Sequence, residues 1–93
     1  MDMRFYVDPE TDEPHIYGHQ VMEEEVADVL RSPDEDRPGR EGSRVVIGRT
    51  QAGRYLRVIY VPEQRSVFVI TAYELSGKPL AAYRRRRRRR GES

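Results

Sequence analysis

The sequence has 93 residues, a length that fits one small domain with a modest core. It contains no cysteine, which excludes disulfides, thiolate metal sites and cysteine nucleophiles. No apolar run approaches the roughly 20 residues needed to cross a bilayer, and the first residues lack the basic and apolar regions of a signal peptide. We therefore expect a cytoplasmic protein with no membrane partner.

The net charge of +1 conceals a strong segregation of charge along the chain. Residues 1–36 hold twelve acidic and two basic residues, and residues 37–83 hold three acidic and eight basic residues. Residues 84–93 add seven arginines and one glutamate. A basic half of this kind indicates a surface for a polyanion or for an acidic partner, unless the charges serve only solubility. Because this half is also rich in aromatic and β-branched residues, we expect a nucleic-acid surface.

The first half of the chain predicts a short strand and one helix. The strand covers residues 3–8, and a turn with a proline at each end follows at residues 9–14. The helix begins near residue 19 and ends at Pro33. Acidic residues crowd its first turn, where the helix dipole favours negative charge. Its apolar stripe, at spacings of i, i+4, i+7 and i+8, consists of Met22, Val26, Val29 and Leu30.

The second half predicts three strands in close succession. A polar loop covers residues 32–42, and the strands follow at residues 43–50, 54–62 and 66–75. The connections between these strands are short enough for hairpins. Consecutive hairpins make neighbouring strands antiparallel, so this half is predicted to be a three-stranded meander.

A basic helix is predicted after the last strand. Pro79 suits its first turn, and Leu80 and Tyr83 are spaced to anchor that turn on the sheet. The predicted architecture is a single small α+β domain over residues 1–83, with an arginine-rich C-terminal extension over residues 84–93. Its order is strand, amphipathic helix, antiparallel meander and basic helix, with one face of the sheet covered by helix.

Three stretches of the chain carry motifs of a known family. The stretch VDPETDEPHIYGHQVMEEEVADVL has a strand, an Asp-Pro, a histidine and an acidic helix, with matching residues at Asp8, Pro9, His19, Glu24, Glu25 and Val29. The stretch RVVIGRTQAGRYLRVIYV has two Gly-Arg pairs in a hairpin, with matching residues at Gly48, Arg49, Gly53, Arg54 and Leu56. The stretch SVFVITAYELSGKPLAAY follows as a last strand and a basic helix. Together these motifs resemble the BrnT-type toxins of the RelE-like ribonuclease toxin superfamily, and equally a neighbouring family of uncharacterised bacterial domains.

The resemblance implies a RelE-like fold and a metal-independent ribonuclease toxin that a cognate antitoxin protein neutralises. It implies RNA as the target, including ribosome-associated mRNA. Two positions differ from the family pattern, because Tyr73 stands where the family has an active-site arginine and Gly18 stands where it has a lysine. Tyrosine does not replace a cation, so the sequence leaves open whether the chain is an endoribonuclease.

Metal-free RNA cleavage needs a base for the 2′-hydroxyl proton, positive charge at the phosphate and an acid for the leaving oxygen. Histidine is the usual base near neutral pH, arginine presents a planar fork to phosphate oxygens, and tyrosine donates a proton or stacks. The candidate catalytic residues are His19, Arg49, Arg54, Arg57 and Tyr73. His15, Tyr55 and Tyr60 are further residues of the same kinds. The chain shows no set of metal ligands and no phosphate-binding glycine loop, so neither a metal nor a cofactor is expected.

Each candidate also has a structural alternative. His19 precedes the helix and could hydrogen-bond its first turn. Arg49 and Arg54 could be exposed hairpin residues, and Arg57 could form a salt bridge with Glu74. Tyr73 could be an ordinary half-buried aromatic residue of a strand.

The arginine run creates a strong positive field rather than a selective site, because seven successive residues on a helix point in all directions. Nucleic-acid binding through the run would be independent of sequence and strongly salt-dependent. The residues proposed to bind nucleic acid are Arg84, Arg85, Arg86, Arg87, Arg88, Arg89 and Arg90. The alternatives are contact with the antitoxin, contact with the acidic helix of the same chain, and a solvated tail.

Two functions of different classes follow. The first is the RNA-targeting toxin component of a bacterial type II toxin–antitoxin system, with metal-independent ribonuclease chemistry. The second is a non-catalytic nucleic-acid-binding or regulatory module on the same scaffold.

Overall fold

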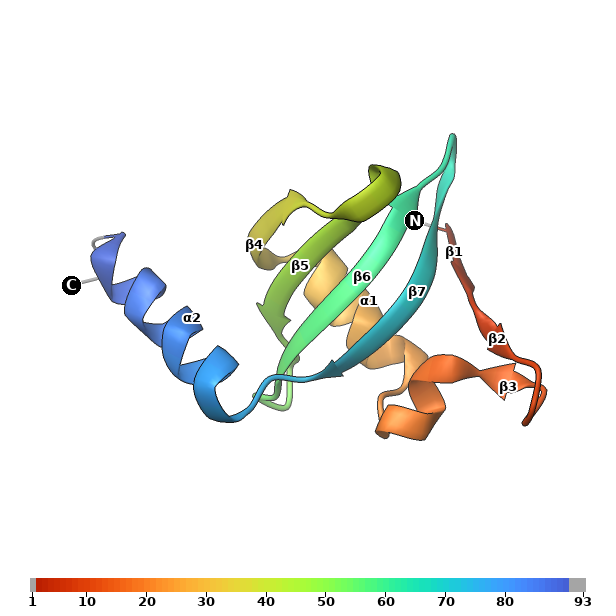
Figure 1. The fold of residues 1–93 in the computed structure, drawn as a ribbon, viewed down its shortest axis with the longest axis horizontal. Helices are drawn as coiled ribbons and strands as arrows, with labels where there is room; N and C mark the ends of the chain where they lie inside the picture. The colour runs from red at the N-terminus through yellow and green to blue at the C-terminus, as the bar shows by residue number, and fades with distance from the viewer. Residues whose placement is uncertain (1, 91–93) are drawn as a thin grey trace.

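Five strands form one mixed β-sheet in the order β1-β7-β6-β5-β4 (Figure 1). The computed structural model describes residues 2–90. The strands of this sheet are β1 (Asp2–Phe5), β4 (Pro33–Pro38), β5 (Arg44–Arg49), β6 (Tyr55–Pro62) and β7 (Ser66–Glu74). β1 runs parallel to β7, and the other neighbours are antiparallel. The predicted meander is therefore confirmed as β5, β6 and β7, at the centre of a larger sheet.

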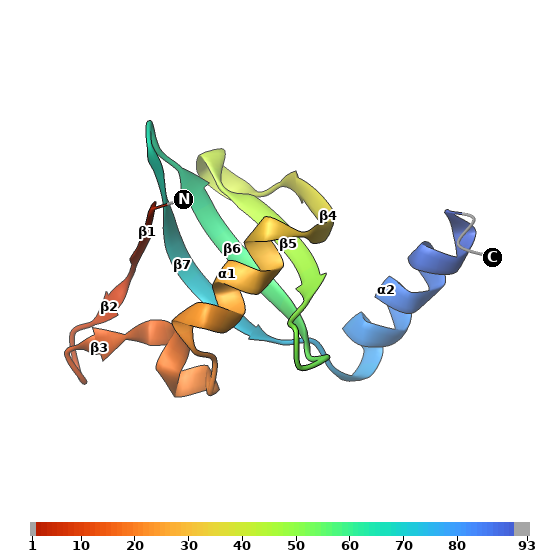
Figure 2. The same cartoon turned by 180° about the vertical axis from the view of Figure 1, so that it is seen from behind.

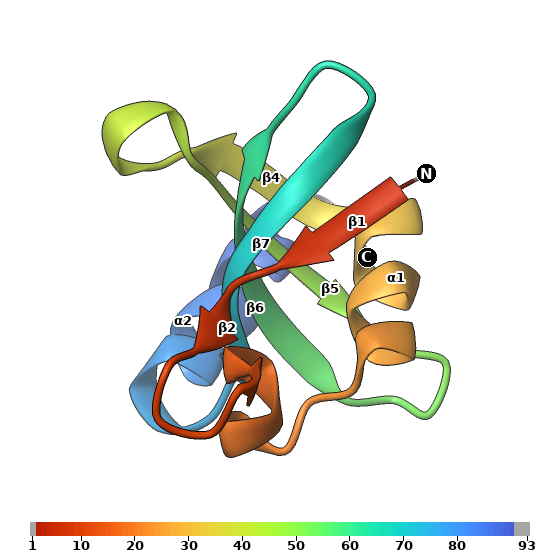
Figure 3. The same ribbon diagram turned by 90° about the vertical axis from the view of Figure 1, so that its right-hand side faces the viewer.

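The two α-helices lie on opposite sides of this sheet, as Figure 3 shows. Figure 2 shows α1 crossing the face of the sheet, while α2 extends from the end of the molecule near β4 and β5. The helices are α1 (Glu23–Arg31) and α2 (Gly77–Arg89), the short 3₁₀ helices are η1 (His15–His19) and η2 (Arg40–Gly42), and a separate small hairpin pairs β2 (Val7–Asp8) with β3 (Glu13–Pro14). The described chain is thus one compact α+β domain. None of the helices within residues 2–90 is long and apolar enough to span a membrane.

The main core lies between α1 and the sheet. Val26 and Val29, which the helical stripe predicted to be buried, are fully buried, and each contributes about 1.5–3 kcal/mol by burial. Met22 is 48% exposed, contrary to the prediction. The helix begins after Met22, because the Glu25 carboxylate accepts a hydrogen bond from the Met22 backbone N–H at 2.9 Å. The buried place before the helix is taken by Val21 instead.

Strand β4 corrects the prediction of a loop over residues 32–42. Its sequence, PDEDRP, has no apolar side chain and a proline at each end, which conceals a strand from pattern analysis. It is an edge strand paired only with β5, where prolines and charges are tolerated. Its one buried side chain is Glu35, which arginines neutralise.

The predicted N-terminal strand over residues 3–8 is divided at Tyr6 into β1 and β2. The Tyr6 backbone N–H still bonds to the Val69 carbonyl at 2.9 Å, but the Tyr6 carbonyl accepts from the His15 N–H at 2.8 Å. The chain therefore leaves the sheet at Tyr6 and forms the β2–β3 hairpin. This departure places η1 against the end of β7.

Helix α2 is anchored to the sheet by a second, smaller apolar cluster. Tyr83 is fully buried there with Ile47 and Leu75, and Leu80 and Tyr55 pack against them. The predicted anchoring by Leu80 and Tyr83 is confirmed. Ile47 points away from the α1 side of the sheet, so α2 covers one end of the opposite face.

Candidate nucleic-acid interface

The sheet face opposite α1 carries several of the predicted site residues. Because Leu56 and Val58 point into the core, strand alternation directs Arg57 to the other face. Arg57 is paired with Tyr73 of β7 and with Ile47 of β5, so these three side chains share that face. Helix α2 covers the Ile47 end and η1 lies against β7, while no α-helix within residues 2–90 covers the part of this face between them (Figure 3).

His19, Tyr73 and Arg57 form a contiguous cluster on this face. The rings of His19 and Tyr73 meet edge to face with centroids 5.9 Å apart. Arg57 Nη1 donates a hydrogen bond to Tyr73 Oη at 3.4 Å, and its Cζ lies 6.0 Å from the Tyr73 ring centroid. η1 positions His19, because Ile16 anchors this short helix in the core and Gln20 ends it in the left-handed conformation. Three of the five catalytic candidates are thereby brought together.

Arg57 has no carboxylate partner among residues 2–90, although it is partly buried. Its Nε atom is buried and has no hydrogen-bond partner in this part of the chain. A buried donor without an acceptor costs about 1–3 kcal/mol. An anion bound beside Tyr73 would supply both the missing acceptor and the missing negative charge.

An aromatic row extends the cluster towards the β2–β3 hairpin. The His15 ring lies 5.0 Å from the His19 ring and 6.0 Å from the Tyr6 ring. His15 Nδ1 is 3.5 Å from Asp8 Oδ2. The row of Tyr6, His15, His19 and Tyr73 thus offers successive ring surfaces beside β7.

A second group of arginines surrounds Tyr55 on the same face. The Cζ atoms of Arg49 and Arg84 lie 5.8 Å and 5.9 Å from the Tyr55 ring centroid, and Arg87 Nη1 donates to Tyr55 Oη at 3.4 Å. Arg49, and after it Arg87, holds the pKa of Tyr55 below its ordinary value against the opposing effect of burial. Arg49 thus lies on the same face as Arg57, beside a different tyrosine.

Arg54 does not join these residues. It lies on the α1 side of the sheet, where it forms ion pairs with Glu25 at 2.7 Å and Glu74 at 3.2 Å and donates to the Gln20 carbonyl at 3.1 Å. Arg54 is therefore separated from Arg49 and Arg57, the other two arginines among the catalytic candidates. Glu74, which the sequence offered as a partner for Arg57, pairs with Arg54 instead.

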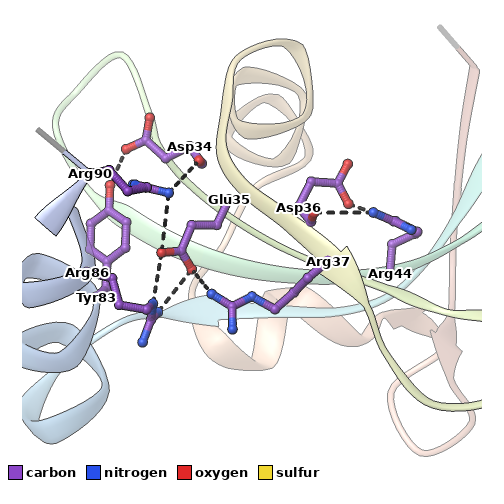
Figure 4. Close-up of polar contacts among 8 residues, drawn as sticks. All are labelled: Asp34, Glu35, Asp36, Arg37, Arg44, Tyr83, Arg86 and Arg90. Atoms are coloured by element: carbon purple, nitrogen blue, oxygen red, sulfur yellow. Dashed lines mark hydrogen bonds and ion pairs between the residues drawn. The ribbon is translucent and has the colours of Figure 1, made fainter.

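The arginine run is divided between an inner and an outer side of α2. On the inner side, Arg86 donates to Glu35 at 2.9 and 3.0 Å and Arg90 lies 3.7 Å from Glu35 (Figure 4). Tyr83 donates to the Asp34 carboxylate, and Arg87 lies 3.9 Å from it. The inner arginines therefore serve to neutralise the edge strand β4. Contact with acidic residues of the same chain was one of the sequence alternatives, but the acidic partner is β4 and not α1.

Glu35 remains ionised in this arrangement despite its burial. Burial raises the pKa of the Glu35 carboxyl, but the hydrogen bonds and charge of Arg86, together with Arg37, outweigh it and lower the pKa below its ordinary value. Arg37 approaches Glu35 to 2.8 Å. The inner contacts are thus charge-assisted hydrogen bonds to an almost fully covered carboxylate.

The outer arginines are exposed. Arg85, Arg88 and Arg89 line a shallow hollow of about 330 Å³, and none of them forms an ion pair with a residue of the described chain. Arg84 is also outside these ion pairs and stacks over Tyr55. These four residues supply a positive surface next to the open sheet face.

A cavity of about 270 Å³ lies at the other end of the open face, between the β2–β3 hairpin and η1. It is lined by Asp8, Thr11, Glu13, Pro14, His15, Tyr17, Gly18 and His19. The sequence analysis interpreted residues 9–14 only as a turn and did not identify Glu13 as a candidate. The acidic residues between the two prolines were the feature of the sequence that could have pointed to it. No group of three or more potential metal ligands is present within residues 2–90.

Comparison with known proteins gives a family and no activity. A family model described as a domain of unknown function, DUF4258, matches residues 18–74. This range contains His19, Arg57 and Tyr73 and ends before α2. No curated protein and no solved structure matches the chain.

Proposed function

The chain belongs to the DUF4258 family, and we propose that it is an RNA-targeting protein with metal-independent ribonuclease chemistry, acting in the cytoplasm as the toxin of a bacterial type II toxin–antitoxin pair with a RelE-like fold. The observation that carries the proposal is the environment of the Arg57 side chain. This guanidinium is partly buried, lacks a counter-ion in the described chain, and contacts Tyr73, whose ring meets His19. A phosphodiester is the anion that would make chemical use of a histidine and a phenol beside it.

The proposed reaction uses these three residues in separate roles. His19 removes the proton from a ribose 2′-hydroxyl, whose oxygen attacks the adjacent phosphorus. Arg57 stabilises the charge that develops on the phosphate oxygens. The bond from phosphorus to the 5′-oxygen breaks as Tyr73 donates its phenolic proton to that oxygen, leaving a 2′,3′-cyclic phosphate. Tyr73 recovers a proton from solvent and His19 releases its own.

The open face also supports binding of a single strand. Tyr73 and Tyr55 present rings on one face of the sheet, and Arg57 and Arg49 stand beside them. Stacking of a base on an aromatic side chain contributes about 1–3 kcal/mol. The outer arginines of α2 would add contacts to the phosphate backbone without sequence preference.

The test compares Arg57→Ala with a matched control, Arg65→Ala. Arg65 is exposed in the turn between β6 and β7, so its substitution removes the same charge away from the cluster. Wild-type protein should arrest growth when expressed alone and should cleave single-stranded RNA in the presence of EDTA. Arg57→Ala should slow cleavage on the order of 100-fold or more, whereas Arg65→Ala should behave as wild type. Intact RNA and normal growth with the wild type would contradict the ribonuclease proposal.

The second candidate function is a non-catalytic nucleic-acid-binding module. Arg54 favours this candidate, because its ion pairs with Glu25 and Glu74 keep it away from the His19–Tyr73 cluster. Within the described chain, Arg57 is then the arginine that contacts Tyr73 and could stabilise a phosphate there. This candidate predicts salt-sensitive RNA binding without cleavage, and the EDTA assay distinguishes the two.

A further inference from the structure

We propose that the cavity between the β2–β3 hairpin and η1 is a binding site for one guanine base of a bound RNA strand. The inference rests on the proposed function and adds base specificity to it. The cavity includes His19 in its wall, and His19 contacts Tyr73. A base held there would therefore be next to a phosphate held at Arg57.

The size and walls of the cavity fit a single base. Its volume of about 270 Å³ is below the roughly 300–1,000 Å³ of pockets for drug-sized ligands. Pro14, His15 and Tyr17 contribute ring surfaces to the wall, and unstacked RNA bases bind proteins by stacking on such surfaces.

Two carboxylates, Asp8 and Glu13, are among the polar groups that line the cavity. Asp8 and Glu13 are directly opposite each other in the β2–β3 pairing, and like charges in such a pair repel. Asp8 accepts from the Glu10 N–H at 2.9 Å and lies 3.5 Å from His15 Nδ1. Within residues 2–90 the Glu13 carboxylate has no hydrogen bond or ion pair. A ligand that donates two adjacent N–H groups would satisfy Glu13 and reduce the repulsion.

Guanine is the base with that arrangement. Its Watson–Crick edge carries the N1–H and N2–H₂ donors side by side, so both can bond to the two oxygens of one carboxylate. Adenine and cytosine place one amino group next to a ring acceptor, which a carboxylate repels. Uracil places one N–H between two carbonyl oxygens. The phosphate of the same nucleotide is repelled by Asp8 and Glu13 and attracted by Arg57, which fixes the orientation of the strand.

The test measures binding rather than cleavage. The probes are short 2′-O-methyl oligouridines that carry one guanine, one adenine, one cytosine or no substitution; their blocked 2′-oxygens prevent the proposed reaction. Wild-type protein should bind the guanine probe about tenfold more tightly than the others by fluorescence anisotropy at constant salt. Glu13→Gln should lose this preference, because the glutamine amide pairs with the adjacent donor and acceptor that adenine and cytosine present.

Glu10→Gln is the matched control. Glu10 is exposed in the same hairpin and does not line the cavity, so its substitution removes the same charge and should leave the guanine preference unchanged. Glu13 is itself exposed, and circular dichroism would verify that its variant is folded. Equal affinity of the wild type for all four probes, or an unchanged preference in Glu13→Gln, would overturn the guanine site while leaving RNA binding intact. Absence of binding to every probe would overturn the proposed function and the guanine site together.

Discussion

Arg86 of α2 forms two hydrogen bonds to Glu35 of β4 across 51 residues of sequence. Glu35 has a side chain only 4% exposed, and Arg37 and Arg90 also lie within 4 Å of it. The basic helix is therefore held by the acidic edge strand. This relationship separates the structural arginines of α2 from those that are open to a ligand.

Glu35→Gln should loosen α2 and reduce the free energy of unfolding. The variant loses the charge that the surrounding arginines share, and we expect a cost of about 1–2 kcal/mol, because these arginines are partly solvated. Denaturant unfolding measures the cost. Hydrogen exchange should show that the substitution increases the exchange rate of α2 amides more than that of β6 amides. Glu63→Gln is the control, since Glu63 pairs with Arg4 at the surface; a loss as large as that of Glu35→Gln would contradict the prediction.

The same carboxylate should make stability depend on acid pH. The pKa of Glu35 is lowered in the folded protein, because Arg86 and Arg37 outweigh the effect of burial. Such a group stabilises the fold above its unfolded-state pKa of about 4.3, and the stabilisation is lost as the pH falls through the lower folded value. The unfolding midpoint of the wild type should therefore decrease as the pH is lowered below about 4.3. The midpoint of Glu35→Gln should decrease less over the same pH range. If the plots of unfolding midpoint against pH were parallel for the two proteins, other carboxyl groups would be responsible for the acid sensitivity.

Tyr83 should produce an opposite dependence at alkaline pH. Burial, followed by the hydrogen bond to Asp34, raises the pKa of Tyr83 to about 12. Because the folded-state pKa is raised, the contribution is complete below the ordinary pKa of about 10 and is lost as the pH rises towards 12. Ultraviolet titration should show a late phenol that Tyr83→Phe lacks, and Tyr83→Phe should lose less stability than the wild type over this range. A late phenol that persists in the variant would contradict the assignment.

The outer arginines should control the salt dependence of RNA binding. Replacing Arg85, Arg88 and Arg89 by alanine removes three cations that have no ion pair in the described chain. The slope of log affinity against log salt should become shallower by about 2, since each phosphate contact to a single strand contributes roughly 0.7. Thermal stability should change little. An unchanged slope would show that RNA does not reach this side of α2.

Arg54 and Arg57 should respond differently to the same substitution. Arg54→Ala leaves Glu25 without its ion pair at the start of α1 and should reduce the free energy of unfolding by about 1–2 kcal/mol. Arg57→Ala removes a side chain without a carboxylate partner in the described chain and should reduce RNA affinity more than stability. Unfolding curves and binding curves of both variants measure the contrast. An equal loss of RNA affinity in both variants would contradict the prediction and show that Arg54 also takes part in RNA binding.

Local sequence patterns correctly predicted the buried face of α1 and the antiparallel meander. The helical spacing of Val26 and Val29 predicted their burial, and the short hairpins fixed the meander. The parallel pairing of β1 with β7 was not predictable, because Met3 and Val67 are partners far apart in sequence. β4 was missed because its only buried side chain, Glu35, is charged.

The candidate site was predictable to a similar extent. The hairpin between β6 and β7 brings Arg57 and Tyr73 together, whereas the approach of His19 depends on where the chain leaves the sheet at Tyr6. The sequence could not show that Arg54 would meet Glu25, since a single residue of shift in register would have turned it to the other face. Glu13 was missed because its importance depends on a cavity that forms where the β2–β3 hairpin meets η1, and the pattern of residues 8–19 does not reveal how these two elements pack.

The pairing of Arg86 with Glu35 also has a consequence for biosynthesis. A growing polypeptide presents β4 and its acidic side chains well before the ribosome has added α2. Until the basic helix emerges, the carboxylate that the finished fold covers stands in water beside Arg37 alone. The charge of this edge strand is therefore compensated late in synthesis, once the arginines of α2 have been added.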